Sequence, residues 1–406
     1  MARFLFVVPP LRGHINPTVA VGEELLARGH DVAWSAQADL AGPLLPASAK
    51  LLPAGEAVPP EVLDALISRS EGLRGAAALK FLWEDFLGPL ARSMVPGVDA
   101  AATSFRPSVL VSDQQAVAGA LVARTRQIPW ATSASTSAEL VDPLEGLPKV
   151  AEWIRSQLVA FQVEHGVSTA DATSGDLRFS DQLVIAFTTK ELLGPDADLP
   201  PQVALVGPAF NGRSRDIDVP FDLDCLNDGV PHVLVSLGTV SAGAGKRFFT
   251  TVVEALESAP VQVILVAPPE LIERAPDNFI VRSFVPQASL LAHVDAVVCH
   301  AGHNTVCESL AHGLPLVVAP IRDDQPVVAQ QVVNAGAGIR VRFGRVRAPE
   351  LRDAVMSVLS EPSYRAAAHR VQRSFKAAGG AGAAANRLEE LAASHEADES
   401  GAAVLR

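Results

Sequence analysis

The sequence predicts an α/β protein with two Rossmann-like domains, each built on a doubly wound parallel sheet. An order of strand, loop, helix and strand opens the chain and returns near residue 232, and strands alternate with helices in both halves. A chain of 406 residues is too long for a domain with one ordinary hydrophobic core and suits two domains. We therefore expect domains at 1–210 and 232–370, a linker at 211–231, and C-terminal helices with a frayed tail at 371–406.

The first half begins with an apolar, β-rich run at 4–8, followed by a loop rich in Pro and Gly. Asn16 is a good N-cap and Pro17 suits the first helical position, so a helix is expected to begin there and to end near Gly29. The later strands of this half are predicted at 31–35, 108–112 and 182–186.

The second half repeats the pattern of the first. A strand at 232–236 and a Gly-rich loop at 237–245 precede a helix at 246–257 and a strand at 261–267. Two further strands are predicted at 296–299 and 316–319.

Polar and small residues indicate where the predicted domains and the C-terminal helices are connected. The stretch 211–231 is polar and rich in Asp, which is typical of a linker. At the C-terminal end, 365–376 and 383–393 predict two helical pieces separated by a Gly/Ala break, with fraying from about Ser394 onward.

Composition excludes several classes of function. Lys and Arg number 33 against 45 Asp and Glu, a net charge of −12 without a basic block, so neither nucleic acid nor an anionic membrane is an expected partner. Nowhere do 18 uncharged apolar residues run together, and the apolar N-terminal run is too short for a signal sequence. The three cysteines lack metal-type clustering. We expect a cytoplasmic protein without stable membrane insertion and without a disulfide framework.

The common nucleotide-binding motifs are missing. Neither first turn carries G-x-G-x-x-G, and no acidic residue ends the second strand, so a nicotinamide site is not expected. The run 243–246 suggests a P-loop, but Val240 stands where that motif needs Gly, and Arg247 stands where it needs Ser or Thr.

The stretch 284–325 is the most informative part of the sequence. His300 directly follows a predicted strand, Gly302 permits a close backbone approach, and Asn304 with Thr305 is expected to open a helix. The amides at the start of a helix attract anions. This stretch therefore predicts an anion site in a chain whose net charge is negative.

The order and spacing of these residues resemble the donor-binding signature of the UDP-glycosyltransferase superfamily, and in particular of its bacterial natural-product and antibiotic glycosyltransferases. The motifs that carry the resemblance lie at 10–17, 234–239 and 284–325. The resemblance implies inverting enzymes of the two-domain B-type fold, with two domains facing across a cleft. It also implies that the first domain binds the acceptor, that the second binds the nucleotide sugar, and that the last helix returns to the first domain.

The resemblance also implies the residues of the donor site. Phe284 would stack on the nucleobase, with the backbone of Val285 at the base edge and Gln287 on the ribose. Glu308 would accept hydrogen bonds from both ribose hydroxyls. Asp324 and Gln325 would hydrogen-bond the sugar hydroxyls. The residues expected around the diphosphate are His300, Gly238, Thr239, Gly302, Asn304 and Thr305.

For catalysis the resemblance implies His14 as the general base and Asp113 as its acidic partner. A neutral imidazole suits a base near pH 7, and a neighbouring carboxylate fixes its tautomer and stabilises the imidazolium. We expect a single in-line displacement with inversion. No metal and no cofactor are expected, because the nucleotide sugar is itself a co-substrate.

The expected partners are a UDP- or dTDP-sugar and a small hydrophobic acceptor that carries a hydroxyl. Asp324 and Gln325 favour a hydroxyl-rich sugar such as glucose. Apolar residues of the first half could wall an acceptor pocket, namely Phe81, Leu82, Trp83, Phe86, Leu87, Trp130, Trp153, Ile154 and Phe161, together with a small-residue loop at 131–137. Transfer to a lipid-linked precursor, epimerisation of a nucleotide sugar, and non-catalytic binding of a nucleotide sugar stay open as alternatives. Either a monomer or a homodimer fits the sequence.

Each candidate residue also has a purely structural explanation. Thr305-x-x-Glu308 matches a capping box, and either Ser112 or Asp113 could cap a helix that begins near Gln115. Taken singly, a residue such as His300 is more often a structural histidine with satisfied hydrogen bonds, and one such as Phe284 is more often a core residue. The site prediction therefore depends on the ensemble of motifs and on no single residue.

Overall fold

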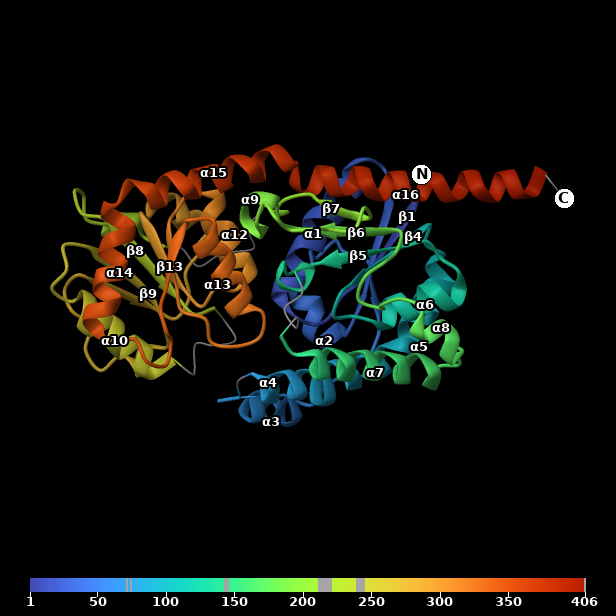
Figure 1. The fold of residues 1–406 in the computed structure, drawn as a ribbon, viewed down its shortest axis with the longest axis horizontal. Helices are drawn as coiled ribbons and strands as arrows, with labels where there is room; N and C mark the ends of the chain where they lie inside the picture. The colour runs from blue at the N-terminus through green and yellow to red at the C-terminus, as the bar shows by residue number, and fades with distance from the viewer. Residues whose placement is uncertain (71, 74, 142–145, 211–220, 239–244, 405–406) are drawn as a thin grey trace. The chain divides into compact units, whose positions relative to one another are not determined.

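Two parallel sheets organise the chain in the computed structural model, which describes residues 1–70, 72–73, 75–141, 146–210, 221–238 and 245–404 (Figure 1). The chain divides into two compact units. The first comprises Met1–Phe187, Asp198–Asn211 and Ala378–Arg406, and the second comprises Thr188–Ala197 and Gly212–Ala377.

The first unit holds a sheet that has seven strands among the described residues, in the order β3-β2-β1-β4-β5-β6-β7. Its strands are β1 Arg3–Val7, β2 Asp31–Ala36, β3 Leu51–Pro53, β4 Val109–Asp113, β5 Trp130–Ala134, β6 Leu183–Ala186 and β7 Val203–Leu205. Its helices are α1 Arg12–Ala27, α2 Ala38–Ala41, α3 Pro60–Ser70, α4 Ala76–Phe81, α5 Gly88–Phe105, α6 Ala118–Arg126, α7 Pro148–Glu164, α8 Thr169–Thr173 and α16 Gly380–Val404.

The second unit holds a sheet that has six strands within the described ranges, in the order β10-β9-β8-β11-β12-β13. Its strands are β8 His232–Ser236, β9 Gln262–Val266, β10 Phe279–Arg282, β11 Ala296–Cys299, β12 Leu316–Val318 and β13 Gly338–Arg340. Its helices are α9 Lys190–Leu193, α10 Lys246–Leu256, α11 Gln287–Leu290, α12 His303–Ala311, α13 Gln325–Asn334, α14 Ala348–Ser360 and α15 Pro362–Ala378.

Both sheets are doubly wound, as predicted. Every strand pair is parallel, and in each sheet the chain starts in the middle, moves to one edge, and then returns to the other side of its first strand. The switch points lie between β1 and β4 and between β8 and β11. Ligands of open α/β sheets bind where the strand order reverses, beyond the carboxyl ends of the strands. Near these points, His14 follows β1, Asp113 ends β4, Gly238 follows β8 and His300 follows β11.

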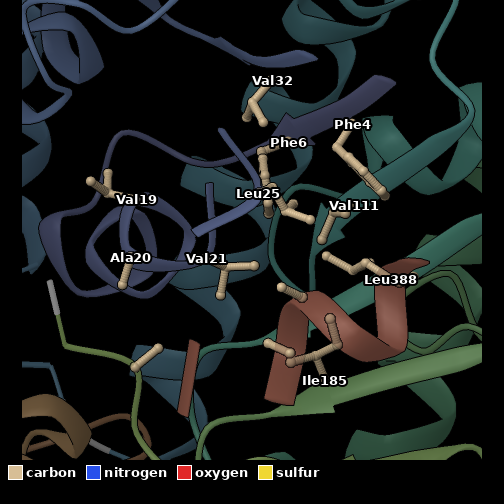
Figure 2. Packing of buried hydrophobic residues seen from close by; sticks show 14 of the residues in the cluster. Phe4, Phe6, Val19, Ala20, Val21, Leu25, Val32, Val111, Ile185 and Leu388 are labelled. Carbon is tan, nitrogen blue, oxygen red and sulfur yellow. The ribbon is translucent and has the colours of Figure 1, made fainter. Parts of the chain in front are cut away.

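The core of the first unit has a layer of helices on each face of the sheet. On one face, apolar residues of α1 and α16 pack against alternate residues of β1, β4 and β6, and Figure 2 shows Leu388 of α16 in this cluster with Leu25, Val111 and Ile185. On the other face, α5, α6 and α7 cover residues such as Leu5 of β1. The alternation arises because successive side chains of a strand point to opposite faces.

The last helix belongs to the first unit. Arg28 Nη1, at the end of α1, lies 2.7 Å from both Asn386 Oδ1 and Glu389 Oε2 of α16, and the Gly380 amide donates to the Val206 carbonyl. α16 runs to Val404, and the fraying expected from about Ser394 stays a prediction.

The unit boundaries differ from the expected ones. α15 stays with the second unit, because Gln372 Nε2 donates to the Ala311 carbonyl and Ser374 Oγ lies 2.8 Å from Thr189 Oγ1. The second unit therefore ends at Ala377 and not at 370, and it includes Thr188–Ala197. Of the expected linker, 211–220 lie outside the described residues, and 221–231 belong to the second unit.

The first helix starts earlier than predicted. α1 begins at Arg12, and its first turn is closed by the amides of His14 and Ile15 on the Leu11 carbonyl. Asn16 is therefore not an N-cap, and Pro17 lies inside the helix. The correction matters for function because it places His14 on a helix and not in a loop.

Candidate active site

The predicted catalytic pair meets at the switch point of the first sheet. His14 lies in the first turn of α1, directly after β1, and Asp113 is the last residue of β4, the neighbour of β1. His14 Nδ1 lies 2.9 Å from Asp113 Oδ1. Only 1% of Asp113 is exposed, whereas 16% of the His14 side chain is exposed. The structure thus joins a buried carboxylate to a partly accessible imidazole.

The chemistry of the pair selects one tautomer of His14. An ionised carboxylate only accepts hydrogen bonds, so the proton between these two groups belongs to Nδ1 of the imidazole. In the neutral ring this places the lone pair on Nε2. An imidazole in this state can take a proton at Nε2, and the carboxylate stabilises the positive charge that results.

Asp113 also has a structural role. Its Oδ1 accepts a hydrogen bond from the Gln115 amide, so the carboxylate closes the turn that follows β4. It does not cap a helix at Gln115, because α6 begins only at Ala118, with Val117 at its N-cap position. The hydrogen bond in this turn and the contact with His14 together fix the position of the carboxylate.

Ser135 is a third member of this group, although the sequence placed it only within the small-residue segment 131–137. Its hydroxyl oxygen lies 2.7 Å from His14 Nδ1, and 4% of the residue is exposed. The expected small-residue loop at 131–137 is in fact strand β5 up to Ala134, and Ser135 follows at once. Asp113 pairs with Ser133 in the register of β4 and β5, so the residue after β5 can reach His14. The pairing of β4 with β5 carries this signal, whereas the sequence analysis treated 131–137 as a loop.

In the second unit, two glycines enclose the imidazole of His300. A Cβ atom on Gly302 would lie 2.5 Å from His300 Nε2, and one on Gly238 would lie 2.8 Å from His300 Cε1. Gly238 also has φ +71°, a conformation that side chains rarely adopt. These positions therefore require glycine if His300 is to keep its place after β11.

Burial keeps His300 neutral. Loss of hydration lowers the pKa of His300 to about 4, against a weaker opposing effect of the Asp324 carboxylate. Its Nδ1 is buried and has no hydrogen-bond partner in the part of the chain that the structure describes. Such an imidazole would bind a phosphate oxygen by donating a hydrogen bond, and it would not form an ion pair at physiological pH.

Helix α12 starts directly beyond His300. Its N-cap position is Gly302, so the helix begins at His303 and Thr305 lies within the first turn. A capping box formed by Thr305 and Glu308 is therefore wrong. The amides of a first helical turn lack partners within the helix, and this geometry favours a bound anion.

Glu308 is held by another predicted donor-site residue. Gln287 Nε2, at the start of α11, donates a hydrogen bond of 2.6 Å to Glu308 Oε2. The two residues are 21 positions apart in the sequence and come from adjacent segments of the predicted signature. The structure thus brings together the two side chains expected at the ribose.

The other predicted donor residues are distributed as follows. Phe284 is half-buried in the loop after β10, whereas Val285 is buried. Asp324 occupies the N-cap position of α13. Gln325 Oε1 accepts hydrogen bonds from the amides of Ile321 and Arg322, so that oxygen supports the loop before α13.

Of the residues expected at the diphosphate, Thr239 lies outside the described residues, whereas Asn304 lies in the first turn of α12.

Most of the apolar residues suggested for an acceptor pocket are core residues. Five are buried in the cluster between the first sheet and α5 to α7, and they are Trp83, Leu87, Trp130, Ile154 and Phe161. Leu82, Phe86 and Trp153 pack against that cluster.

Among the described residues, no three His, Cys, Asp or Glu side chains converge as metal ligands. No helix in the described ranges is long and apolar enough to cross a membrane.

Comparisons with known proteins cover nearly the whole chain. Residues 227–377 match the family model described as UDP-glucoronosyl and UDP-glucosyl transferase. The chain is 30% identical over 410 residues to 4'-demethylrebeccamycin synthase of Lentzea aerocolonigenes, which covers 93% of this chain and 96% of that protein. It is 28% identical to demethyllactenocin mycarosyltransferase of Streptomyces fradiae, covering 96% of this chain and 87% of that protein. Among solved structures, the glycotransferase of kitacinnamycin is similar with a TM-score of 0.73 at 25% identity, covering 96% of this chain and 99% of that chain.

Proposed function

Because the chain belongs to the UDP-glycosyltransferase family, and is a glycosyltransferase with the B-type fold of natural-product enzymes, we propose that it is an inverting hexosyltransferase. Its donor is a UDP- or dTDP-sugar, with glucose as the favoured sugar. Its acceptor is a small hydrophobic natural product with a free hydroxyl. The observation that carries the proposal is the hydrogen bond of 2.9 Å between His14 Nδ1 and Asp113 Oδ1.

In the proposed reaction, His14 Nε2 takes the proton of the acceptor hydroxyl as its oxygen attacks the anomeric carbon. The new C–O bond forms while the bond from the anomeric carbon to the diphosphate oxygen breaks, and the nucleoside diphosphate leaves with that electron pair. The proton remains on His14, where Asp113 stabilises the imidazolium. The amides at the start of α12 and the neutral His300 stabilise the charge on the leaving diphosphate. An α-linked donor therefore gives a β-glycoside.

A donor panel tests the proposed function. The protein is incubated with one phenolic acceptor and, separately, UDP-glucose, dTDP-glucose and dTDP-deoxysugars, and the products are identified by liquid chromatography and mass spectrometry. We expect a glucoside from UDP-glucose. An isomerised or hydrolysed donor without any glycoside would contradict the proposal and would favour an epimerase.

The pair Gln287 and Glu308 predicts a choice of nucleotide. A carboxylate held in place to accept two ribose hydroxyls loses one of these bonds with a 2′-deoxyribose. We expect kcat/KM to be about 10-fold higher or more for UDP-glucose than for dTDP-glucose. Glu308→Ala should bring the two donors within about threefold, mainly through lower activity with UDP-glucose.

The matched control for this experiment is Glu273→Ala, an exposed glutamate of the same unit, which should keep the preference. Equal use of UDP-glucose and dTDP-glucose by the unaltered protein would show that Glu308 does not read the ribose.

The close packing around His300 gives a second prediction. Gly302→Ala would drive the new methyl group into the imidazole, so His300 must leave its position. If His300 binds the diphosphate, the Kd for UDP should rise about 10-fold, which titration calorimetry measures. Gly146→Ala adds the same methyl group in open space and should leave binding unchanged. UDP binding by Gly302→Ala within twofold of the original value would remove His300 from the diphosphate site.

A further inference from the structure

Two oxygen atoms compete for the same nitrogen of His14. Asp113 Oδ1 lies 2.9 Å from Nδ1 and Ser135 Oγ lies 2.7 Å from it. Only one proton sits on Nδ1, and the carboxylate requires it there. In this state the Ser135 hydroxyl can only accept, so the N–H is shared between a carboxylate and a hydroxyl.

The three residues come from neighbouring elements. His14 belongs to the first turn of α1, Asp113 ends β4, and Ser135 follows the adjacent strand β5. Asp113 and Ser135 are both buried, and a hydrogen bond is stronger in such surroundings than in water. The shared N–H therefore restricts the rotation of the imidazole from two directions.

We propose that Ser135 is a positioning residue for the catalytic base, acting through Nδ1 of His14. The proposal rests on His14 being that base. Asp113 selects the tautomer, because its carboxylate accepts only. Ser135 fixes the plane of the ring, so that Nε2 is aimed at the acceptor hydroxyl, and it contributes an additional acceptor when the imidazole becomes charged.

The hydroxyl differs from the carboxylate in one respect that makes the proposal testable. Ser135 can also donate a hydrogen bond. When the carboxylate is absent, Ser135 can donate to an unprotonated Nδ1 and thereby stabilise the tautomer whose proton is on Nε2. That tautomer cannot act as a base at Nε2. The effect of Ser135 on turnover should therefore depend on whether Asp113 is present.

The first experiment replaces Ser135 by alanine in the otherwise unaltered protein. We expect kcat to fall about 10-fold, the size of effect typical of a lost hydrogen bond to a charged group, with KM for donor and acceptor within about twofold. The acidic limb of the pH profile of kcat should move to lower pH, because the imidazolium loses one acceptor. Unchanged kcat with an unchanged pH profile would overturn the proposal.

The matched control is Ser35→Ala on β2 of the same sheet. Ser35 is also buried, but its hydroxyl has no hydrogen-bond partner among the described residues, so kcat should stay within about twofold. An equal loss in both variants would identify a packing effect and overturn the role of Ser135.

The second experiment adds Ser135→Ala to Asp113→Ala. We expect the double variant to be as active as Asp113→Ala or more active, because the hydroxyl no longer stabilises the unproductive tautomer. A further loss of about 10-fold on adding Ser135→Ala would overturn the proposal. Full turnover by His14→Ala would instead refute the general base itself, whereas an inactive His14→Ala with a fully active Ser135→Ala refutes the Ser135 role alone.

Discussion

Replacing His14 by alanine should lower kcat by about 100- to 10,000-fold, the range expected for the loss of a general base. The acceptor hydroxyl would then have to lose its proton to water during the attack on the anomeric carbon. The Kd for UDP should change by less than about twofold, because His14 contributes to the acceptor side only. Steady-state assays and titration calorimetry measure the two quantities.

His165→Ala is the matched control for this variant. His165 is the C-cap residue of α7 in the same unit, and its Nδ1 lies 2.8 Å from the carbonyl oxygen of Phe161 in that helix. Its loss should leave kcat unchanged within about threefold. Unaltered turnover in His14→Ala would refute the assignment of the base.

Asp113→Asn should lower kcat by about 100- to 10,000-fold as well, with UDP binding retained. The amide keeps the shape of the side chain but removes the negative charge that stabilises the imidazolium. Asp113 Oδ1 accepts from the Gln115 amide and also contacts His14 Nδ1, so an amide oxygen in its place keeps both the turn after β4 and the proton on Nδ1. The variant therefore tests the loss of the charge alone.

Asp99→Asn is the control for this charge removal. Asp99 forms an exposed ion pair with Arg126 in the same unit, and such pairs contribute about 1 kcal/mol or less. Its kcat should equal that of the unaltered protein. A value of kcat for Asp113→Asn above about one third of the original would exclude Asp113 from the proton transfer.

The resemblance implied the pair of His14 and Asp113, and the observed strand order explains why the two residues meet. His14 follows β1 and Asp113 ends β4, the two strands that flank the switch point of the doubly wound sheet. The local prediction around His14 was nevertheless wrong. Asn16 and Pro17 are typical of a helix start, yet the Leu11 carbonyl already closes a helical turn before them. Local capping preferences could not reveal that earlier turn.

In the donor segment too, the long-range contact was predicted correctly and the local pattern was not. The motif predicted that Gln287 and Glu308 would serve one ligand, and the structure joins them directly. The capping box was a local pattern that the fold did not use, because α12 begins at His303 with Gly302 at its N-cap position. Ser135 was not singled out within 131–137 because a lone serine after a strand has no signature of its own. It becomes informative only when β5 is placed beside β4.

The C-terminal boundary could not be read from the sequence, because it depends on tertiary contacts. α15 and α16 are separated by a single residue, Gly379, yet they pack against different units. The buried side of α16, which includes Ala384, Ala385 and Leu388, completes the core of the first unit. Small and apolar residues of this kind are compatible with packing against either unit, so composition alone does not assign the helix.

The general-base role of His14 is tested most directly with two phenolic acceptors of similar shape. One, such as 4-nitrophenol, has a pKa of about 7 and is largely ionised at pH 8, whereas the other has a pKa of about 10 and must be deprotonated by the enzyme. The kcat of the unaltered protein is divided by that of His14→Ala for each acceptor. We predict a ratio at least about 10-fold larger for the weakly acidic phenol, because only that acceptor needs the base. Equal ratios for the two phenols would contradict proton abstraction by His14.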